Sequence, residues 1–186
     1  MIDQRKIEEA VTSILKAIVL EPNAEVLVET PRRVAEMYAE FFSGLDKDPL
    51  EALNTGFEEG HDEMVVLKDI PFFSVCEHHL LPFFGQANIG YIPTGRVVGV
   101  SKLARALDIL ARRPQLQERL TRQLADTIFE ALTPDGVGVV LRAEHLCVSL
   151  RGVKKPGSTV VTFASRGSIK TQDTARSEFH AAMSGL

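Results

Sequence analysis

The feature of the sequence that most restricts its possible folds is the order of segments with strand-like and helix-like hydrophobic patterns. Between residues 63 and 164, segments with the pattern of strands enclose two segments with the 3.6-residue period of helices. The expected strands are 63–70, 85–92, 137–150 and 158–164, and the expected helices between them are 101–112 and 114–132. This order of strand, strand, helix, helix, strand, strand predicts a single α+β domain.

Two more helices are expected before this domain, and one after it. Residues 3–20 carry an apolar stripe at helical spacing, and Pro31 directly after Thr30 is typical of a helix start with Thr30 as its N-cap. The polar, turn-rich segment 46–62 is interpreted as a linker, and a closing helix is expected at about 172–183. We therefore expect an N-terminal helical arm, residues 1–50, and a main domain, residues 51–186.

Composition excludes several classes of protein. With 186 residues, 45% of them hydrophobic, the chain can bury a substantial core, and its net charge of −4 argues against binding nucleic acid through overall charge. It has no apolar run long enough to cross a bilayer, and its first residues, MIDQRKIEEA, do not resemble a signal peptide. We expect a cytoplasmic protein, in which a pair of cysteines more often binds metal or reacts than forms a structural disulfide.

The two cysteines lie in two short segments that also carry histidines, SVCEHHLLPFFG at 74–85 and EHLCVSLRG at 144–152. A turn in Cys76-x-x-His79 would place both side chains on one side. If 137–150 is a single strand, His145 and Cys147 point to the same face. A thiolate from each segment with at least one imidazole would make a zinc site, with three or four protein ligands. A disulfide and unrelated core cysteines are the alternatives.

Charged residues near the expected helix starts suggest an anionic ligand. Lys102 and Arg105 follow Ser101 in the first turns of one helix, where cations oppose the helix dipole and a bound phosphate would account for them. Solvated surface charges are the alternative. Glu118 begins the next helix, and its carboxylate could pair with the two adjacent donors of a guanine, although an acid is common in a first helical turn.

Taken together, these segments closely resemble GTP cyclohydrolase I. SVCEHH, GYIP, VVGVSKLAR, RRPQLQERLT and EHLCVSLRGV occur in the family's order and spacing, and TPRRVAEMY and TARSEF also fit. The resemblance spans residues 29–179. It implies a tunnelling fold, in which the antiparallel sheet of a ββααββ catalytic domain joins the sheets of neighbouring subunits in a barrel. It also implies a homodecamer of two face-to-face pentamers, with active sites where subunits meet and with no nucleic-acid or membrane partner.

The resemblance further implies the reaction. GTP and water would give 7,8-dihydroneopterin triphosphate and formate, the first step of tetrahydrofolate and pterin synthesis. One Zn²⁺ per subunit would be held by Cys76, His79 and Cys147, with the fourth position left for water. His78 and His145 would carry protons.

The remaining site residues also follow from the resemblance. Ser101 would assist the rearrangement of the ribose. The guanine would be bound by Gln117 and Glu118. The triphosphate would be held by Lys102, Arg105 and Arg151, with Arg33 reaching in from a neighbouring subunit. Glu36 stands where some relatives carry a further basic residue.

Three alternatives predict different behaviour. A nitrile reductase of queuosine synthesis shares the fold but would use a cysteine nucleophile and NADPH. A binding module without turnover would bind zinc and GTP and release no formate. A structural oligomer with core cysteines would contain no zinc.

Overall fold

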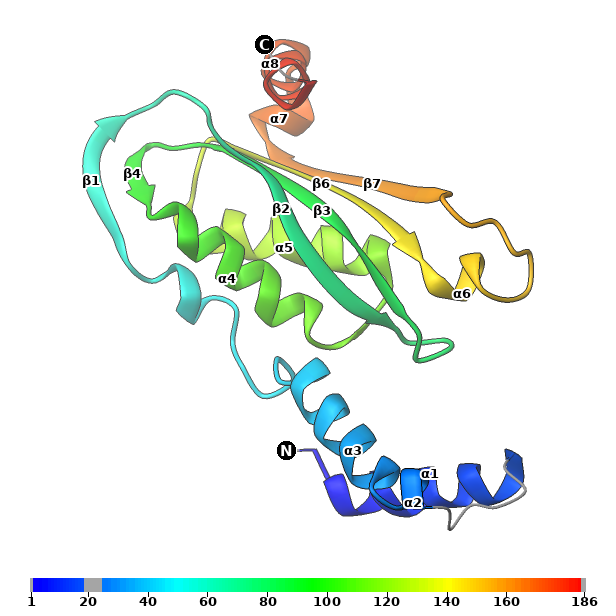
Figure 1. Ribbon diagram of the computed structural model, residues 1–186. Coiled ribbons are helices and arrows are strands. Elements are labelled where there is room, and N and C mark those ends of the chain that lie inside the picture. Colours follow the sequence, from blue (N-terminus) through cyan, green and yellow to red (C-terminus); the bar gives the residue numbers. More distant parts are fainter. Residues whose placement is uncertain (1, 19–24, 185–186) are drawn as a thin grey trace.

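The structure, a computed structural model, describes residues 2–18 and 25–184 (Figure 1). Its N-terminal part is helical, with α1 Gln4–Ile18, α2 Glu25–Val28 and α3 Thr30–Phe41. Helices α1 and α3 lie side by side, and α3 meets the sheet at Phe41, whose ring centroid is 5.4 Å from that of Phe73 on β2 (Figure 1). The expected end of the first helix at residue 20 lies outside the described residues. The N-cap of α3 is Glu29, so the prediction that Thr30 is the N-cap was wrong by one residue, with Pro31 inside the first turn.

The main sheet has five strands in the order β5-β2-β3-β6-β7. Their bounds are β2 Val65–Cys76, β3 Pro82–Ile92, β5 Pro114–Gln115, β6 Gly136–His145 and β7 Thr159–Gly167. The four long strands pair antiparallel, and the short β5 pairs parallel with the end of β2. With α4 Val100–Ala111 and α5 Gln117–Leu132 between β3 and β6, the predicted α+β class and ββααββ order are confirmed.

A second, two-stranded sheet lies in a segment that we expected to be irregular. After the short 3-10 helix η1, Glu51–Leu53, strand β1, Gly56–His61, pairs antiparallel with β4, Gly95–Val98. The prediction that 46–62 is only a linker was therefore wrong. The sequence GFEEGH lacks apolar alternation because β1 is almost fully exposed, and its pairing with β4 is a long-range contact.

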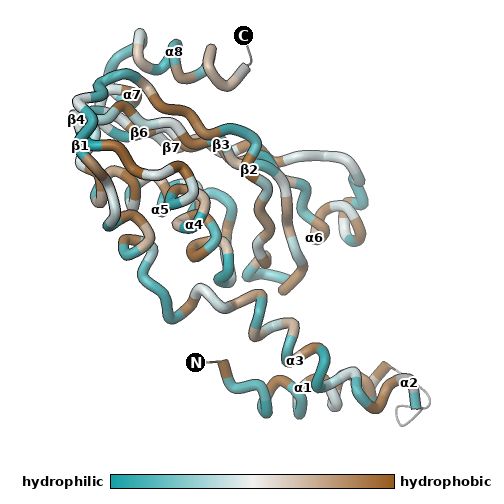
Figure 2. Tube along the Cα trace, turned by 60° about the vertical axis from the view of Figure 1, so that its left-hand side comes forward, coloured by the Kyte–Doolittle hydropathy of each residue, from teal (hydrophilic) through white to brown (hydrophobic). Residues whose placement is uncertain are grey.

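Helices α4 and α5 cover one face of the main sheet and form the core with it (Figure 1). Figure 2 shows hydrophobic residues along the strands and on the helices packed against them. The helices contribute Leu103, Leu107, Leu120, Leu124 and Ile128, all fully buried. From the facing strands, Ile89, Val139 and Leu141 are equally buried. The apolar positions that gave α5 its helical period thus form its core face, although the helix begins at Gln117 and not at Pro114 as expected.

The C-terminal helices pack on the other face of the sheet. These are α7 Ser168–Thr171 and α8 Asp173–Ser184. Phe179 of α8 is fully buried, against Gly90 of β3 and Gly138 of β6, which are paired in register. Neither glycine has a side chain on this face, so the phenylalanine ring can lie directly on the two strands.

Strand β6 is shorter than expected. It ends at His145, and a helical turn, α6 Leu146–Ser149, follows. The predicted strand 137–150 was wrong in its last part, and so was the argument that Cys147 shares a strand face with His145. No helix in residues 2–18 and 25–184 is both long enough and apolar enough to cross a membrane.

Candidate active site

The first cysteine-containing segment forms a tight turn between β2 and β3. Cys76 is the last residue of β2, and its carbonyl accepts hydrogen bonds from the backbone N–H groups of His79 (3.4 Å) and Leu80 (2.9 Å). Leu80 has a positive φ of 52°, which allows the chain to reverse here. The turn brings Nδ1 of His79 to 4.0 Å from Sγ of Cys76.

The second segment meets this turn because β3 pairs with β6. Phe83, just after the turn, is in register with His145, and the helical turn α6 then carries Cys147 toward the same place. The ligand atoms of Cys76, His79 and Cys147 all lie within 4.8 Å of one another. We call these three residues the Cys–His–Cys cluster.

The cluster suits a transition-metal ion. Two thiols and one imidazole are the donors that zinc and similar ions prefer. Burial raises the pKa of the Cys147 thiol, and the neighbouring Cys76 raises it further. Two thiolates so close together repel each other, and a bound cation would remove that cost. Both cysteines are free thiols, so the disulfide alternative is absent from the structure.

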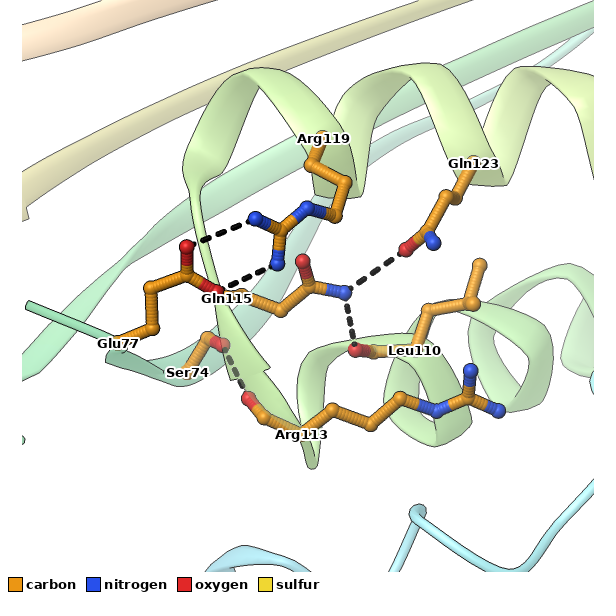
Figure 3. Close-up of polar contacts among 7 residues, drawn as sticks. All are labelled: Ser74, Glu77, Leu110, Arg113, Gln115, Arg119 and Gln123. Atoms are coloured by element: carbon orange, nitrogen blue, oxygen red, sulfur yellow. Dashed lines mark hydrogen bonds and ion pairs between the residues drawn. The ribbon is translucent and has the colours of Figure 1, made fainter.

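A network of polar contacts holds the turn against the start of α5 (Figure 3). The carboxylate of Glu77 accepts two hydrogen bonds from the guanidinium of Arg119, at 2.6 and 2.8 Å, and this pairing lowers the pKa of Glu77. The backbone N–H of Glu77 donates to the carbonyl of Gln115 (3.0 Å). On β2, before the turn, the hydroxyl of Ser74 donates to the carbonyl of Ala111 (2.6 Å). The turn is thereby fixed to α4 and α5 together.

Gln115 is the buried centre of this network, only 1% exposed. Its Nε2 donates to the carbonyl of Leu110 and to Oε1 of Gln123, both at 2.9 Å (Figure 3). Its Oε1 is buried without a hydrogen-bond partner among the described residues. Sequence reasoning missed Glu77, Arg119 and Gln115. Glu77 and Arg119 pair although they are far apart in the sequence, and Gln115 is joined to the turn through its backbone carbonyl, which leaves no sequence signal.

His145 is half-buried between two side chains. Its ring stacks in parallel on Phe83, with centroids 4.5 Å apart, and its Nε2 lies 2.7 Å from Oε1 of Gln117. Burial lowers the pKa of His145, and the carboxylate of Glu118 acts in the opposite direction. The side chain of Gln117 faces inward, whereas that of Glu118 is exposed.

Other predicted site residues share this end of the molecule. His78 is exposed next to His79 in the turn after β2, and Arg151 is exposed just after α6. In Figure 1 this turn, α6 and the start of α5 lie at the same end of the sheet.

The predicted triphosphate-binding residues of α4 are not brought to this end. Ser101 and Lys102 lie in the first turn of α4, beside β4, at the opposite end of the sheet (Figure 1). A helix rises about 1.5 Å per residue, so most of the length of α4 lies between these two residues and the C-terminal end of the helix. Arg105 lines a cavity of about 500 Å³ with Lys47 and Asp108, and neither cysteine contributes to this cavity. Arg33 is exposed on α3.

Comparison with known proteins gives a consistent result over nearly the whole chain. The sequence model of the family described as GTP cyclohydrolase I matches residues 7–184. A protein from Dehalococcoides mccartyi named GTP cyclohydrolase 1 is 58% identical over 181 residues, 96% of each chain. Proteins of the same name from Geobacillus kaustophilus and Caldanaerobacter subterraneus are 59% and 55% identical, over 93% and 96% of this chain and 93% and 95% of theirs.

A solved structure also resembles the chain, though too weakly to support an argument. It is the archaeosine synthase QueF-Like in the apo form, with a TM-score of 0.45 and 24% sequence identity, over 56% of this chain and 93% of that one. The sequence comparisons are decisive by themselves: the chain belongs to the GTP cyclohydrolase I family, a family of hydrolases.

Proposed function

We propose that this chain is a zinc-dependent GTP cyclohydrolase. It opens the imidazole ring of the guanine of GTP, releases formate, rearranges the ribose and closes a new ring to form 7,8-dihydroneopterin triphosphate. The observation that carries the proposal is the Cys–His–Cys cluster, with its ligand atoms within 4.8 Å of one another, in a chain whose relatives are named GTP cyclohydrolase 1.

Cys76, His79 and Cys147 would hold one zinc ion per subunit. Three protein ligands are typical of catalytic zinc sites, whereas structural sites use four. A bound zinc ion would supply Lewis acidity for the opening of the imidazole ring. The network through Glu77 and Arg119 keeps the turn that carries two of the ligands in place.

Two histidines beside the cluster are suited to proton transfer. His145 is held by Phe83 and Gln117, and its lowered pKa favours the neutral ring, which can accept a proton. His78 is exposed next to the ligand His79. Ser101 lies at the opposite end of the sheet, so it would assist the later rearrangement only in the site of a neighbouring subunit.

Residues at the start of α5 would recognise the base. The exposed carboxylate of Glu118 can accept both the N1–H and the amino group of guanine, whereas adenine lacks this pair of donors. Glu118 would thereby give a preference for GTP over ATP. Arg151 lies at the same end of the molecule and would contact the triphosphate.

A second copy of the chain would complete the site. Lys102 and Arg105 lie away from the cluster within one chain, and Arg33 lies on the helical arm, so a neighbouring subunit is needed to bring such cations to the triphosphate. The outer strand β7 has exposed apolar residues, among them Val161 (61%) and Phe163 (42%), and an open strand edge can pair with another chain. We propose a homodecamer of two pentamers, built from a helical arm, 1–50, and a catalytic domain, 51–186.

Incubation of the purified protein with GTP tests this function. After oxidation of the mixture, neopterin fluorescence and one equivalent of formate are expected, and both should disappear with a chelator and return with zinc. Bound zinc and GTP without formate would contradict the proposal and favour a binding module. NADPH consumption with a nitrile substrate would favour the reductase.

A further inference from the structure

The side chain of Gln117 is buried and bonded inside the protein. It is 1% exposed, although it is adjacent to the exposed Glu118. Its Oε1 lies 2.7 Å from Nε2 of His145. Its Nε2 lies within 3.1 Å of the carbonyl oxygens of Leu141 and Val160 and of the hydroxyl of Thr162. All of these contacts are to the protein, which leaves little of the amide for a bound base.

These contacts determine which way the amide of Gln117 points. The carbonyls of Leu141 and Val160, at 3.1 and 3.0 Å, can only accept hydrogen bonds, so the NH₂ group must face them. Oε1 therefore faces His145. A carbonyl oxygen only accepts, so the hydrogen bond at 2.7 Å requires a hydrogen on Nε2 of His145.

The rest of the ring of His145 is equally restrained. It stacks on the fully buried Phe83 with an angle of 2° between the rings, and the two residues are in register on β3 and β6. Among residues 2–18 and 25–184, Nδ1 of His145 has no hydrogen-bond partner. One ring nitrogen is thus fixed as a donor, and the other is left for a ligand.

We propose that Gln117 is a positioning residue that holds His145 with its Nε2–H on Oε1, so that Nδ1 is the atom that exchanges protons with the substrate. This inference rests on the proposed GTP cyclohydrolase function. The hydrogen bond from Nε2–H to Oε1 of Gln117, together with the stack on Phe83, fixes the orientation of the ring and the nitrogen that faces away from Gln117. The two adjacent residues then have separate tasks. The buried Gln117 orients His145, and the exposed Glu118 would bind the base.

Kinetics of Gln117→Met distinguish positioning from base binding. Methionine has a similar length and cannot accept the hydrogen bond. We expect kcat to fall by about 10- to 100-fold, because a misaligned proton carrier loses much of its contribution. The KM for GTP should stay within about threefold of wild type, since no ground-state contact is lost. A large rise in KM with kcat nearly unchanged would show that Gln117 binds the base and would overturn the proposal.

Two variants calibrate this result. Gln172→Met makes the same chemical change at an exposed side chain between α7 and α8, away from His145 and from the network around Gln115, and should leave kcat and KM close to wild type. Glu118→Gln should raise the KM for GTP, which gives the signature of a base contact next to Gln117.

Neutron diffraction from crystals of the wild-type zinc-loaded protein gives a readout that needs neither turnover nor a variant. We expect a deuteron on Nε2 of His145, directed at Oε1 of Gln117. A deuteron on Nδ1 alone would overturn the proposal, even if Gln117→Met fails to fold. Absence of GTP turnover would contradict the proposed function and leave this measurement unaffected.

Discussion

At the scale of single residues, burial and charge decide the chemistry of the Cys–His–Cys cluster. Cys76 is buried and Cys147 half-buried, and burial and the neighbouring Cys76 both raise the cost of a thiolate on Cys147. A divalent cation relieves this cost, so all three residues of the cluster depend on one another. His78, exposed in the same turn, is not part of the cluster.

Substitution of a ligand and of its neighbour should therefore have different effects. Cys147→Ala is expected to abolish both bound zinc and turnover, because two remaining donors hold the ion poorly. His78→Ala should retain zinc and lose about 100-fold or more in rate, as expected for a proton carrier. Metal analysis of the purified proteins with the neopterin assay checks both.

The control is His61→Ala, which removes an exposed histidine on β1 and should change neither quantity. Full activity of Cys147→Ala would show that Cys147 is not a ligand. Loss of zinc from His78→Ala would mean that the two histidines have been assigned the wrong way round.

At the scale of elements, the turn after β2 depends on α5 for its position. The ion pair between Glu77 and Arg119 joins the residue that follows Cys76 to the first turn of the helix. Both side chains are about one-third exposed, so the pair contributes more to the position of the turn than to global stability.

Arg119→Met should thus weaken metal binding more than folding. We expect zinc affinity to fall by about 10-fold, the lower end of what is typical when a supporting contact around a metal site is lost. Competition with a chromophoric chelator measures the affinity, and calorimetry measures Tm. Arg122→Met, an exposed change on the same helix, is the control. Unchanged affinity in Arg119→Met would show that the turn holds its shape without the ion pair.

The contact between α8 and the sheet depends on two glycines. A Cβ on Gly138 would lie 2.7 Å from Cε1 of Phe179, and a Cβ on Gly90 would lie equally close to the other side of this ring. Gly138→Ala is expected to displace α8 and lower stability by about 1–3 kcal/mol, as overpacking of a core does. The shift in the urea or thermal unfolding transition measures this effect.

Gly99→Ala is the matched control for that experiment. A Cβ at Gly99 meets nothing closer than 3.9 Å, and its φ of −59° suits any residue. Its stability should be unchanged or slightly higher, because alanine restricts the unfolded chain. Wild-type stability of Gly138→Ala would contradict this prediction, because it would show that the Phe179 ring can move away from an added Cβ at no cost.

At the scale of the whole molecule, a single chain leaves surfaces uncovered. The exposed apolar residues of β7 accompany an open strand edge, and Ile14 (55%) and Ile18 (73%) of α1 are exposed although they belong to the predicted apolar stripe. Only Val11 of that helix is buried. These features support assembly through both the sheet and the helical arm.

Val161→Glu tests assembly through β7. A carboxylate on this edge strand should lower the fraction of large oligomer and lower turnover with it, while zinc stays bound, because the cluster lies within one chain. Size-exclusion chromatography with light scattering measures the oligomer. Lys170→Glu, an exposed charge change on α7 and not on an open strand edge, should assemble normally. Normal assembly of Val161→Glu would place the subunit contact elsewhere.

The sequence by itself determined the elements and the chemical groups. Hydrophobic periods depend only on local spacing, so the ββααββ order, the core face of α5 and the closing helix could be predicted, with errors at element ends. The two cysteine segments could also be singled out as donors of one metal site, whereas the choice of His79 among the histidines came from the family resemblance.

Only the tertiary structure decided how these groups are placed. The pairing of β1 with β4, the end of β6 at His145, the inward side chain of Gln117 and the bond between Glu77 and Arg119 all depend on partners far away in the sequence. Such contacts produce no periodic pattern in the sequence. Their free energy comes from burial and hydrogen bonds that form only when the chain has folded. For the same reason, the distance of Lys102 from the cluster could not be foreseen, since spacing along a chain does not fix which end of a sheet a helix start will occupy.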